Sequence, residues 1–421
     1  MGFKDEVKDF LKAGHWPTLL TALLYFDFCF AIWVLNGAMA PFIAEQFHLS
    51  PAQKGFMVSV PVIAGALMRF PLGILSQYIG RKRAALLEMG IITGCLFFGW
   101  KFVSTYSHVL SMGIALGVAG ASFGVALSLG SGSYPAKYKG LAMGIAGAGN
   151  SGTVLAMLFA PPLAKLYGWK TVYGIAMIPM VTAFLLLLLF AREPEDQEAK
   201  KKVSDYLKIL WDRDCWTFNL IYSVTFGGFI GLSSFLPVFF ADHYGIPKAE
   251  VGRYAAVIVV MASILRVAGG WLSDRLGGIR LLHWLIVIIL VSVGFAALLP
   301  SNPWVMVMIL VVTFAAMGAG NGAVFQLVPL RFRGDTAVAS SLIGEIGALA
   351  GGFLPNAMGL GKQYTGSFAP GFLAGVGLCA ASAGLLLLVS RRWTTTWVGA
   401  HGRALESFGQ ERRHAFAPDI D

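Results

Sequence analysis

Charged side chains are scarce in this sequence of 421 residues. Asp, Glu, Lys and Arg together make up 13% of the chain, whereas hydrophobic residues make up 57%. The mean hydropathy is +0.70. A chain of this composition has too few polar side chains to cover the surface of a soluble globular protein. The composition therefore excludes that class and favours a membrane protein.

Cysteine is also rare, and no catalytic or metal-binding pattern accompanies it. The four cysteines lie within or beside apolar stretches and lack the spacing of metal ligands, so we interpret them as thiols of the core. They are Cys29, Cys95, Cys215 and Cys379. The sequence has no cofactor-binding loop and no nucleophile constellation, and its polar loops are too short to hold a catalytic domain. We therefore expect no metal, no cofactor and no enzymatic activity.

Long apolar stretches, in contrast, fill most of the chain. About twenty apolar residues cross the hydrocarbon core of a bilayer, and the sequence contains twelve such stretches. They cover residues 17–44, 52–79, 84–103, 107–136, 140–164, 170–191, 214–242, 249–275, 281–300, 303–330, 336–360 and 367–390. The sequence predicts an all-α membrane protein with twelve transmembrane helices in a lipid bilayer.

The net charge of +10 does not indicate a nucleic-acid partner. When both termini and every second loop are placed on one side of the membrane, that side holds 23 of the 32 Lys and Arg residues. Positive residues collect on the cytoplasmic side of membrane proteins. We therefore expect both termini in the cytoplasm and the chain in the cell inner (plasma) membrane.

The chain divides near its middle, at a polar stretch that begins with Arg192. We predict five parts, which are a cytoplasmic amphipathic segment at 1–15, a six-helix half at 16–191, a linker at 192–213, a second six-helix half at 214–391 and a cytoplasmic tail at 392–421. A constant offset pairs residues of the two halves. The pairs are Arg69 with Arg266, Gly73 with Gly270, Ser76 with Ser273, Gly80 with Gly277 and Arg83 with Arg280. We therefore expect two pseudo-symmetric halves.

Six plus six repeated helices with cytoplasmic termini resemble the major facilitator superfamily. The stretch after the predicted second helix, Gly73-Ile-Leu-Ser-Gln-Tyr-Ile-Gly80-Arg-Lys-Arg83, is similar to the signature of this superfamily. A second copy of the signature follows the predicted eighth helix, as Gly270-Trp-Leu-Ser-Asp-Arg-Leu-Gly277. The resemblance implies two halves that rock about a central site. It also implies a gating role for Asp274, the acidic residue of the signature, which is replaced by Gln77 in the first half.

Two arginines are predicted inside the membrane. Arg69 and Arg266 each precede a loop glycine by eleven residues, which is about 16 Å of helix and half of a core about 30 Å thick. A guanidinium at this depth costs at least about 2.5–3.5 kcal/mol and keeps its proton. One interpretation is a structural arginine satisfied by carbonyls or a buried acid. The other, which we prefer, is a pair that binds a planar oxyanion by paired hydrogen bonds.

Four further side chains are predicted at the depth of the arginines. Asn150 and Tyr222 would supply hydrogen-bonding groups, and Phe123 and Phe226 would supply aromatic faces. For each of them, ordinary helix packing is the alternative.

These residues lie in motifs that resemble the nitrate/nitrite porter family of the superfamily. The motifs are Gly-Ala-Leu-Met-Arg69, Gly144-Ile-Ala-Gly-Ala-Gly-Asn150-Ser-Gly, Tyr222-Ser-Val-Thr-Phe226-Gly and Ile343-Gly-Glu-Ile-Gly-Ala-Leu-Ala-Gly-Gly-Phe-Leu-Pro355. The resemblance implies that the two arginines clamp nitrate or nitrite, that Asn150 and Tyr222 add hydrogen bonds, and that Phe123 and Phe226 cover the faces of the anion.

Glycines recur through these motifs at positions where helices pack closely and slide. We predict a conformational role for Gly144, Gly147, Gly152, Gly344, Gly347 and Gly351.

Two intramembrane acids, Asp27 and Glu345, are candidates for proton coupling. Burial favours a neutral carboxyl and a nearby arginine favours a charged one, and a fixed counter-ion is the alternative for both. Our preferred hypothesis is secondary active transport of nitrate with protons, with Asp27 as the coupling group. Nitrate/nitrite exchange is the near-equal alternative, followed by a carrier of another anion and by a sensor that binds nitrate without moving it.

Overall fold

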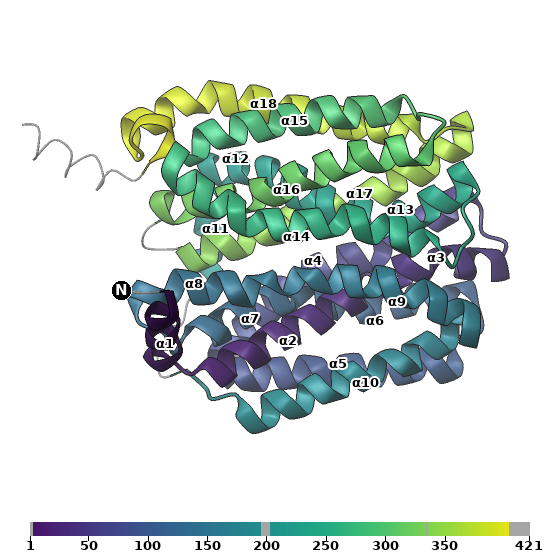
Figure 1. The fold of residues 1–421 in the computed structure, drawn as a ribbon, viewed down its shortest axis with the longest axis horizontal. Coiled ribbons are helices and arrows are strands. Elements are labelled where there is room, and N and C mark those ends of the chain that lie inside the picture. The colour runs from purple at the N-terminus through teal and green to yellow at the C-terminus, as the bar shows by residue number, and fades with distance from the viewer. Residues whose placement is uncertain (1–2, 195–202, 333–335, 404–421) are drawn as a thin grey trace, which may run out of the picture.

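The computed structural model describes residues 3–194, 203–332 and 336–403, and it is a bundle of helices in two halves (Figure 1). The first half comprises α2 (Trp16–Trp33), α3 (Leu35–Gln46), α4 (Pro51–Ile79), α5 (Arg81–Phe102), α6 (Tyr106–Gly117), α7 (Ser122–Ser131), α8 (Ala136–Gly147), α9 (Gly152–Tyr167) and α10 (Trp169–Phe190). The second comprises α12 (Arg213–Tyr222), α13 (Gly228–Tyr244), α14 (Val251–Leu276), α15 (Gly278–Ala297), α16 (Pro303–Arg331), α17 (Thr336–Thr365) and α18 (Ala369–Thr396).

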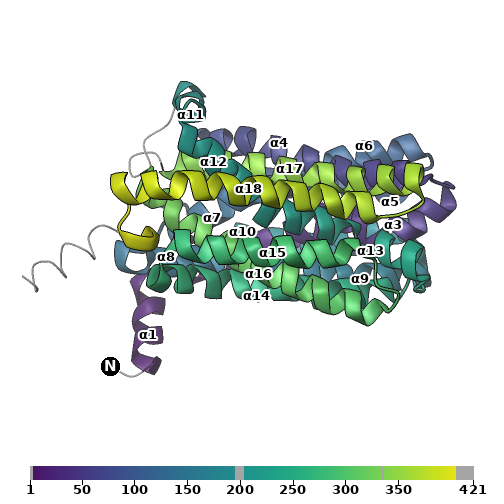
Figure 2. The ribbon, with the colours of Figure 1, turned by 90° about the horizontal axis from the view of Figure 1, so that it is seen from above.

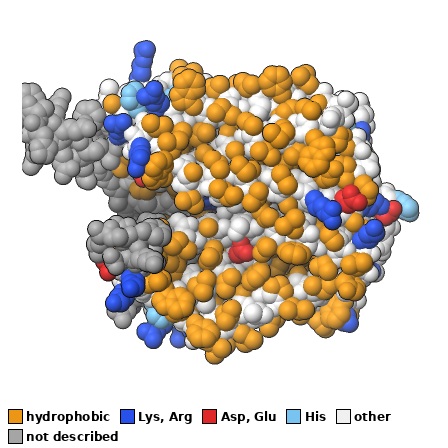
Figure 3. All heavy atoms as spheres, in the orientation of Figure 1, with side chains coloured by type: hydrophobic (Ala, Val, Ile, Leu, Met, Phe, Trp, Pro, Cys, Tyr) orange, Lys and Arg blue, Asp and Glu red, His pale blue; other side chains and the backbone are white. Residues whose placement is uncertain are grey.

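The helical architecture follows from the apolar composition, because a chain in lipid must satisfy its backbone groups within each segment. In the described parts of the chain, twelve helical stretches are long and apolar enough to cross a membrane. Hydrophobic side chains cover the middle of the face shown in Figure 3, and charged ones gather near its two ends. The predicted fold class and number of spans are confirmed.

Four of the twelve spans are not continuous α-helices, which the sequence did not predict. The first span breaks between α2 and α3, at Val34. The fourth and fifth contain 3-10 turns, η1 (Val118–Ala121) and η2 (Ala148–Ser151), and the seventh contains a π-helical turn, η3 (Ser223–Gly227). Such turns shift the direction of the side chains that follow them and free backbone groups for other partners.

The terminal end of the bundle is the end where the chain begins and α18 stops, on the left of Figure 1. The short helices α1 (Phe3–Ala13) and α11 (Val203–Leu210) project sideways there (Figure 2). Part of the predicted linker is therefore helical, while 195–202 lie outside the described residues. The last span continues to Thr396, past its predicted limit at 391.

A buried carboxylate explains why α18 extends this far. Asp214 is 4% exposed and accepts hydrogen bonds from Arg331 Nε at 2.6 Å, from Arg392 and from Trp393 Nε1 at 2.7 Å. Since Arg392 and Trp393 complete this cluster, the helix that carries them stays folded beyond the apolar stretch.

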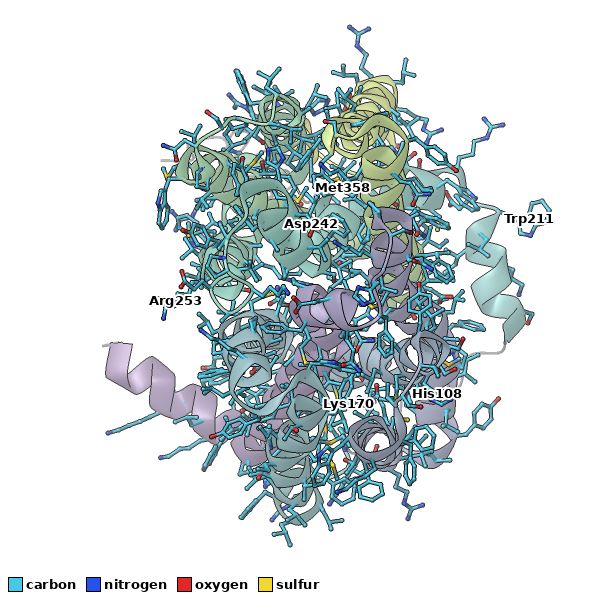
Figure 4. The ribbon with its side chains drawn as sticks, turned by 90° about the vertical axis from the view of Figure 1, so that its right-hand side faces the viewer. His108, Lys170, Trp211, Asp242, Arg253 and Met358 are labelled. Carbon is cyan, nitrogen blue, oxygen red and sulfur yellow. The ribbon has the colours of Figure 1, made fainter. Side chains whose placement is uncertain are left out.

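At the opposite end, two ion pairs join the halves. Lys54 Nζ of α4 lies 2.6 Å from Asp242 Oδ2 of α13, and Lys248 pairs with Glu45 of α3. Figure 4 looks onto this end and labels Asp242. The backbones of α4 and α17 also pack closely at this end, because a Cβ on Gly55 would lie 2.5 Å from the carbonyl oxygen of Pro355. The two halves are thus held together at the end opposite the termini.

The glycines of α8 and α9 differ in what surrounds them, which yields a stability prediction. A Cβ on Gly152 would lie 1.8 Å from the carbonyl oxygen of Asp27, whereas one on Gly144 would meet nothing within 4 Å. Gly152→Ala should lower the free energy of unfolding by about 1–3 kcal/mol, because α2 and α9 must separate. Gly144→Ala should be neutral or slightly stabilising, because alanine favours the helix.

The melting temperatures of both variants in one detergent test this packing. Equal melting temperatures would show that α2 and α9 are not in close contact at this point.

Candidate anion-binding site

Arg69 is buried in the middle of α4, with 5% of its surface exposed. Its Nε donates to the carbonyl oxygen of Gly120 at 3.0 Å, and its Nη1 donates to that of Gly344 at 2.7 Å. Gly120 belongs to η1 in the first half and Gly344 to α17 in the second. Arg69 therefore links the halves through its side chain, and carbonyls satisfy two of its three nitrogens.

Aromatic rings surround the guanidinium of Arg69. Its Cζ lies 5.3 Å from the ring centroid of Trp33, 5.6 Å from that of Phe123 and 5.0 Å from that of Phe226. Arg266 Cζ of α14 lies 5.3 Å from the ring centroid of Phe123. Phe123 therefore contacts both arginines, and the structure brings together the two cations and the two predicted rings. Each cation over a ring contributes favourably once it is removed from water.

The predicted tyrosine lies beside the same rings. Tyr222 ends α12 and stacks on Phe226, with ring centroids 5.1 Å apart and an interplanar angle of 9°. It is close enough to Arg266 for a side-chain hydrogen bond. The π-helical turn η3 begins directly after Tyr222 and carries Phe226, so this irregular turn sets the position of one ring against the other.

Two aromatic residues of the site were not predicted. Trp33 contacts Arg69 as described, and Phe325 of α16 lies 5.2 Å from the Tyr222 ring and 6.1 Å from the Phe123 ring. The internal repeat contains a signal for the second, because Gly322-Ala-Val-Phe325 resembles Gly120-Ala-Ser-Phe123, at an offset five residues longer than that of the two arginines. The sequence gives no comparable signal for Trp33, since a tryptophan in an apolar helix is most simply interpreted as a packing residue.

Several buried polar atoms of the predicted site residues have no hydrogen-bond partner among the described residues. They are Arg69 Nη2, Arg266 Nη1, and both Nδ2 and Oδ1 of Asn150 in η2. An unpartnered buried polar group costs about 1–3 kcal/mol, and more when it is charged. Three of these atoms are donors. An anion between the arginines would satisfy the arginine donors that lack partners in the described chain.

The two candidate acids occupy different surroundings. Asp27 of α2 accepts a hydrogen bond from Ser151 Oγ at 2.6 Å, and its backbone packs against Gly152. Glu345 follows Gly344 on α17, is electrostatically attracted to Arg69, and keeps a buried Oε2 without a partner in the described chain. The structure therefore groups Glu345 with the arginines, and Asp27 with the turn that carries Asn150.

The residues predicted to have a conformational or gating role fall into two groups, those that border the site and those that lie away from it. Gly347 packs against Tyr222 and Gly351 against the backbone of Gly227, with Cβ distances of 2.5 Å in both cases, and Gly344 lies beside Arg69. Gly144 and Gly147 face open space. Asp274 is exposed near the end of α14, apart from the arginines. The glycines of α17 thus border the site directly.

A twelve-span bundle in which each half contributes an arginine to one buried central site is the architecture of a secondary transporter. The chain belongs to the Major Facilitator Superfamily, whose family model matches residues 21–355. This is a family of transporters and not of enzymes.

The relatives of the chain agree with the resemblance found in the motifs. A "Nitrite extrusion protein" of Bacillus subtilis (strain 168) is 30% identical over 353 residues, 82% of this chain and 87% of the relative. A "Probable nitrate/nitrite antiporter NarK1" of Thermus thermophilus is 29% identical over 380 residues, 83% of this chain and 85% of the relative. The predicted likeness to nitrate/nitrite porters is confirmed.

Solved structures agree on the fold. A bacterial homolog of the human lysosomal transporter Spinster matches with a TM-score of 0.71 at 21% identity, over 91% of this chain and 98% of that one. The human organic anion transporter MFSD10 matches with a TM-score of 0.69 at 14% identity, over 88% and 99%.

The arrangement of the arginines predicts that charge alone is not sufficient at these positions. Arg69→Lys and Arg266→Lys should each abolish nitrate flux in proteoliposomes while the protein still folds, because an ammonium cannot reproduce the planar fork. Arg280→Lys is the matched control, since Arg280 is exposed and lies outside the site. Wild-type flux from either folded site variant would contradict the two-arginine clamp.

Proposed function

We propose that this protein carries nitrate and nitrite across the membrane by alternating access of its two halves. The observation that carries the proposal is the pair of arginines, one from each half, whose buried Arg69 Nη2 and Arg266 Nη1 lack partners in the described residues. Both guanidinium groups lie against the ring of Phe123. The names of the relatives point to the same anions.

The shape of the site favours a flat monovalent oxyanion. The rings of Phe123 and Phe226 supply flat apolar surfaces beside Arg69, and guanidinium forks match planar oxyanions through paired hydrogen bonds. A tetrahedral dianion would lose more hydration than this apolar surrounding returns. Asn150 and Tyr222 complete the polar contacts in this proposal.

Anion binding also explains how the halves would be released. Arg69 donates to the carbonyls of Gly120 and Gly344, and so ties α17 to the first half. An oxyanion is a stronger acceptor than a carbonyl, and it reduces the repulsion between two cations in a region of low dielectric constant. When an anion is bound, Arg69 would therefore replace its hydrogen bonds between the halves by hydrogen bonds to the anion. The two halves would then be free to rock.

The terminal end of the bundle is cytoplasmic in this proposal, because it carries most of the Lys and Arg residues. The ion pairs Lys54–Asp242 and Lys248–Glu45 then close the outer side of the inner membrane.

For coupling, we favour entry of nitrate with protons. Glu345 is the acid that interacts with Arg69, so its proton occupancy would change the net charge at the clamp. Asp27 stays a candidate through its contact with Ser151, beside Asn150. Exchange of nitrate for nitrite is the second candidate function, and the name of the Thermus thermophilus relative, a probable nitrate/nitrite antiporter, favours it.

The cargo is tested by counterflow in proteoliposomes loaded with nitrate. External nitrate and nitrite should both drive exchange and should compete with each other, whereas sulfate and phosphate should not, because the site suits a flat, weakly hydrated monoanion. Comparable inhibition by sulfate would exclude this cargo class. The absence of any flux from a protein that binds nitrate would identify a sensor.

Coupling is tested on Glu345→Gln and Asp27→Asn in parallel. The variant of the proton-binding residue should lose uptake driven by a pH gradient but keep nitrate-for-nitrate exchange, because exchange requires no change in proton occupancy. A counter-ion variant should instead lose affinity and both modes of flux, because it leaves a buried charge unpaired. If neither variant alters gradient-driven uptake, neither acid is the coupling group. A wild-type protein that shows no gradient-driven uptake but exchanges nitrate for nitrite would be an anion exchanger.

A further inference from the structure

A second buried amide, Asn321 of α16, has no role in the site described so far. It is 1% exposed, and neither its Nδ2 nor its Oδ1 has a hydrogen-bond partner in the described ranges. An amide offers two donors and two acceptor lone pairs, and leaving them buried and unpaired destabilises the fold. The same description applies to Asn150 in the fifth span.

The neighbours of Asn321 place it at the level of Arg266. A Cβ on Gly322 would lie 2.3 Å from the carbonyl oxygen of Arg266, and a Cβ on Gly320 would lie 2.5 Å from Thr225 Cγ2. Asn321 stands between these two glycines in the chain. It therefore lies at the depth of one clamp arginine and beside the π-helical turn that carries Phe226.

The residues one helical turn away show which way this face of α16 points. Positions four apart share a face of an α-helix, so Met317, Asn321 and Phe325 lie in one row. Phe325 contacts the Tyr222 ring at 5.2 Å, and Met317 Cε lies 2.6 Å from a Cβ built on Gly228. The row therefore faces the seventh span from Tyr222 to Gly228. Asn321 is the polar member of the row, opposite η3.

We propose that Asn321 is a further anion-binding residue, whose Nδ2 donates to an oxygen of the flat oxyanion held between Arg69 and Arg266. The proposal rests on the proposed function. The Oδ1 of the same amide can accept from Arg266 Nη1 or Thr225 Oγ1, both of which are buried and unpartnered in the described chain. A neutral amide adds a donor without adding positive charge. Asn321 would therefore make the site more selective for the anion without increasing the electrostatic attraction that holds it.

The test compares Asn321→Leu with Thr313→Val in the same helix. Leucine has nearly the shape of asparagine without its polar atoms. Thr313 is a suitable control because its hydroxyl is bonded to Ser292 Oγ at 2.8 Å and to the carbonyl of Ile309 at 2.9 Å. The melting temperature of each purified protein in detergent is measured in sodium nitrate and in sodium gluconate at equal ionic strength, and nitrate affinity is obtained from its dependence on nitrate concentration.

In gluconate, Asn321→Leu should melt at or above the wild-type temperature, because an unpartnered buried amide has been replaced by an apolar group of its shape. In nitrate it should show about tenfold weaker affinity, the loss of one hydrogen bond to a charged group. Thr313→Val should keep wild-type affinity. Asn321→Asp, a second variant of the same size, should bind nitrate more weakly still, because it places a negative charge beside the anion.

Wild-type nitrate affinity in either folded Asn321 variant would overturn this inference and leave the proposed function standing. A wild-type protein whose melting temperature does not respond to nitrate, and which shows no nitrate flux, would overturn the proposed function and the inference with it.

Discussion

Two guanidinium groups in the middle of an apolar bundle, those of the buried Arg69 and the half-buried Arg266, are the constraint on which the rest of the site depends. Neither arginine can lose its charge, and a charge at this depth is costly. The structure compensates Arg69 with the carbonyls of Gly120 and Gly344 and with three aromatic faces. The compensation is incomplete, because one nitrogen of each arginine is left without a partner in the residues described. In the proposed function, an anion supplies the missing partners.

The irregular turns supply groups that surround the two arginines. The carbonyl of Gly120 belongs to the 3-10 turn η1, Asn150 belongs to η2, and Phe226 belongs to the π-helical turn η3. A regular α-helix keeps its carbonyls within its own ladder. Interruptions of this kind make backbone groups available inside a membrane, where they are tolerated only in protein-lined surroundings. The glycines of α17 then allow the seventh span to lie close to the site, since Gly347 and Gly351 contact Tyr222 and Gly227.

Depth along the membrane could be predicted from the sequence, but direction around the helix axis could not. Counting residues from the loop glycines placed Arg69 and Arg266 at one level, and the structure brings both against Phe123. The sequence also placed Asp27 and Glu345 inside the membrane, yet of these two acids only Glu345 interacts with Arg69. Each residue turns an α-helix by about 100°, so a single 3-10 or π turn redirects every side chain after it. The sequence motifs do not show where such turns fall, and for that reason the broken spans were not predicted.

The central claim is that an anion replaces the carbonyls as the partner of the clamp, and structures with and without nitrate test it most directly. The account predicts difference density for a flat ligand between Arg69 and Arg266, against the rings of Phe123 and Phe226, with Arg69 moved away from at least one of its carbonyl partners. Density at another site, or an unchanged Arg69 still bonded to Gly120 and Gly344 in saturating nitrate, would contradict it.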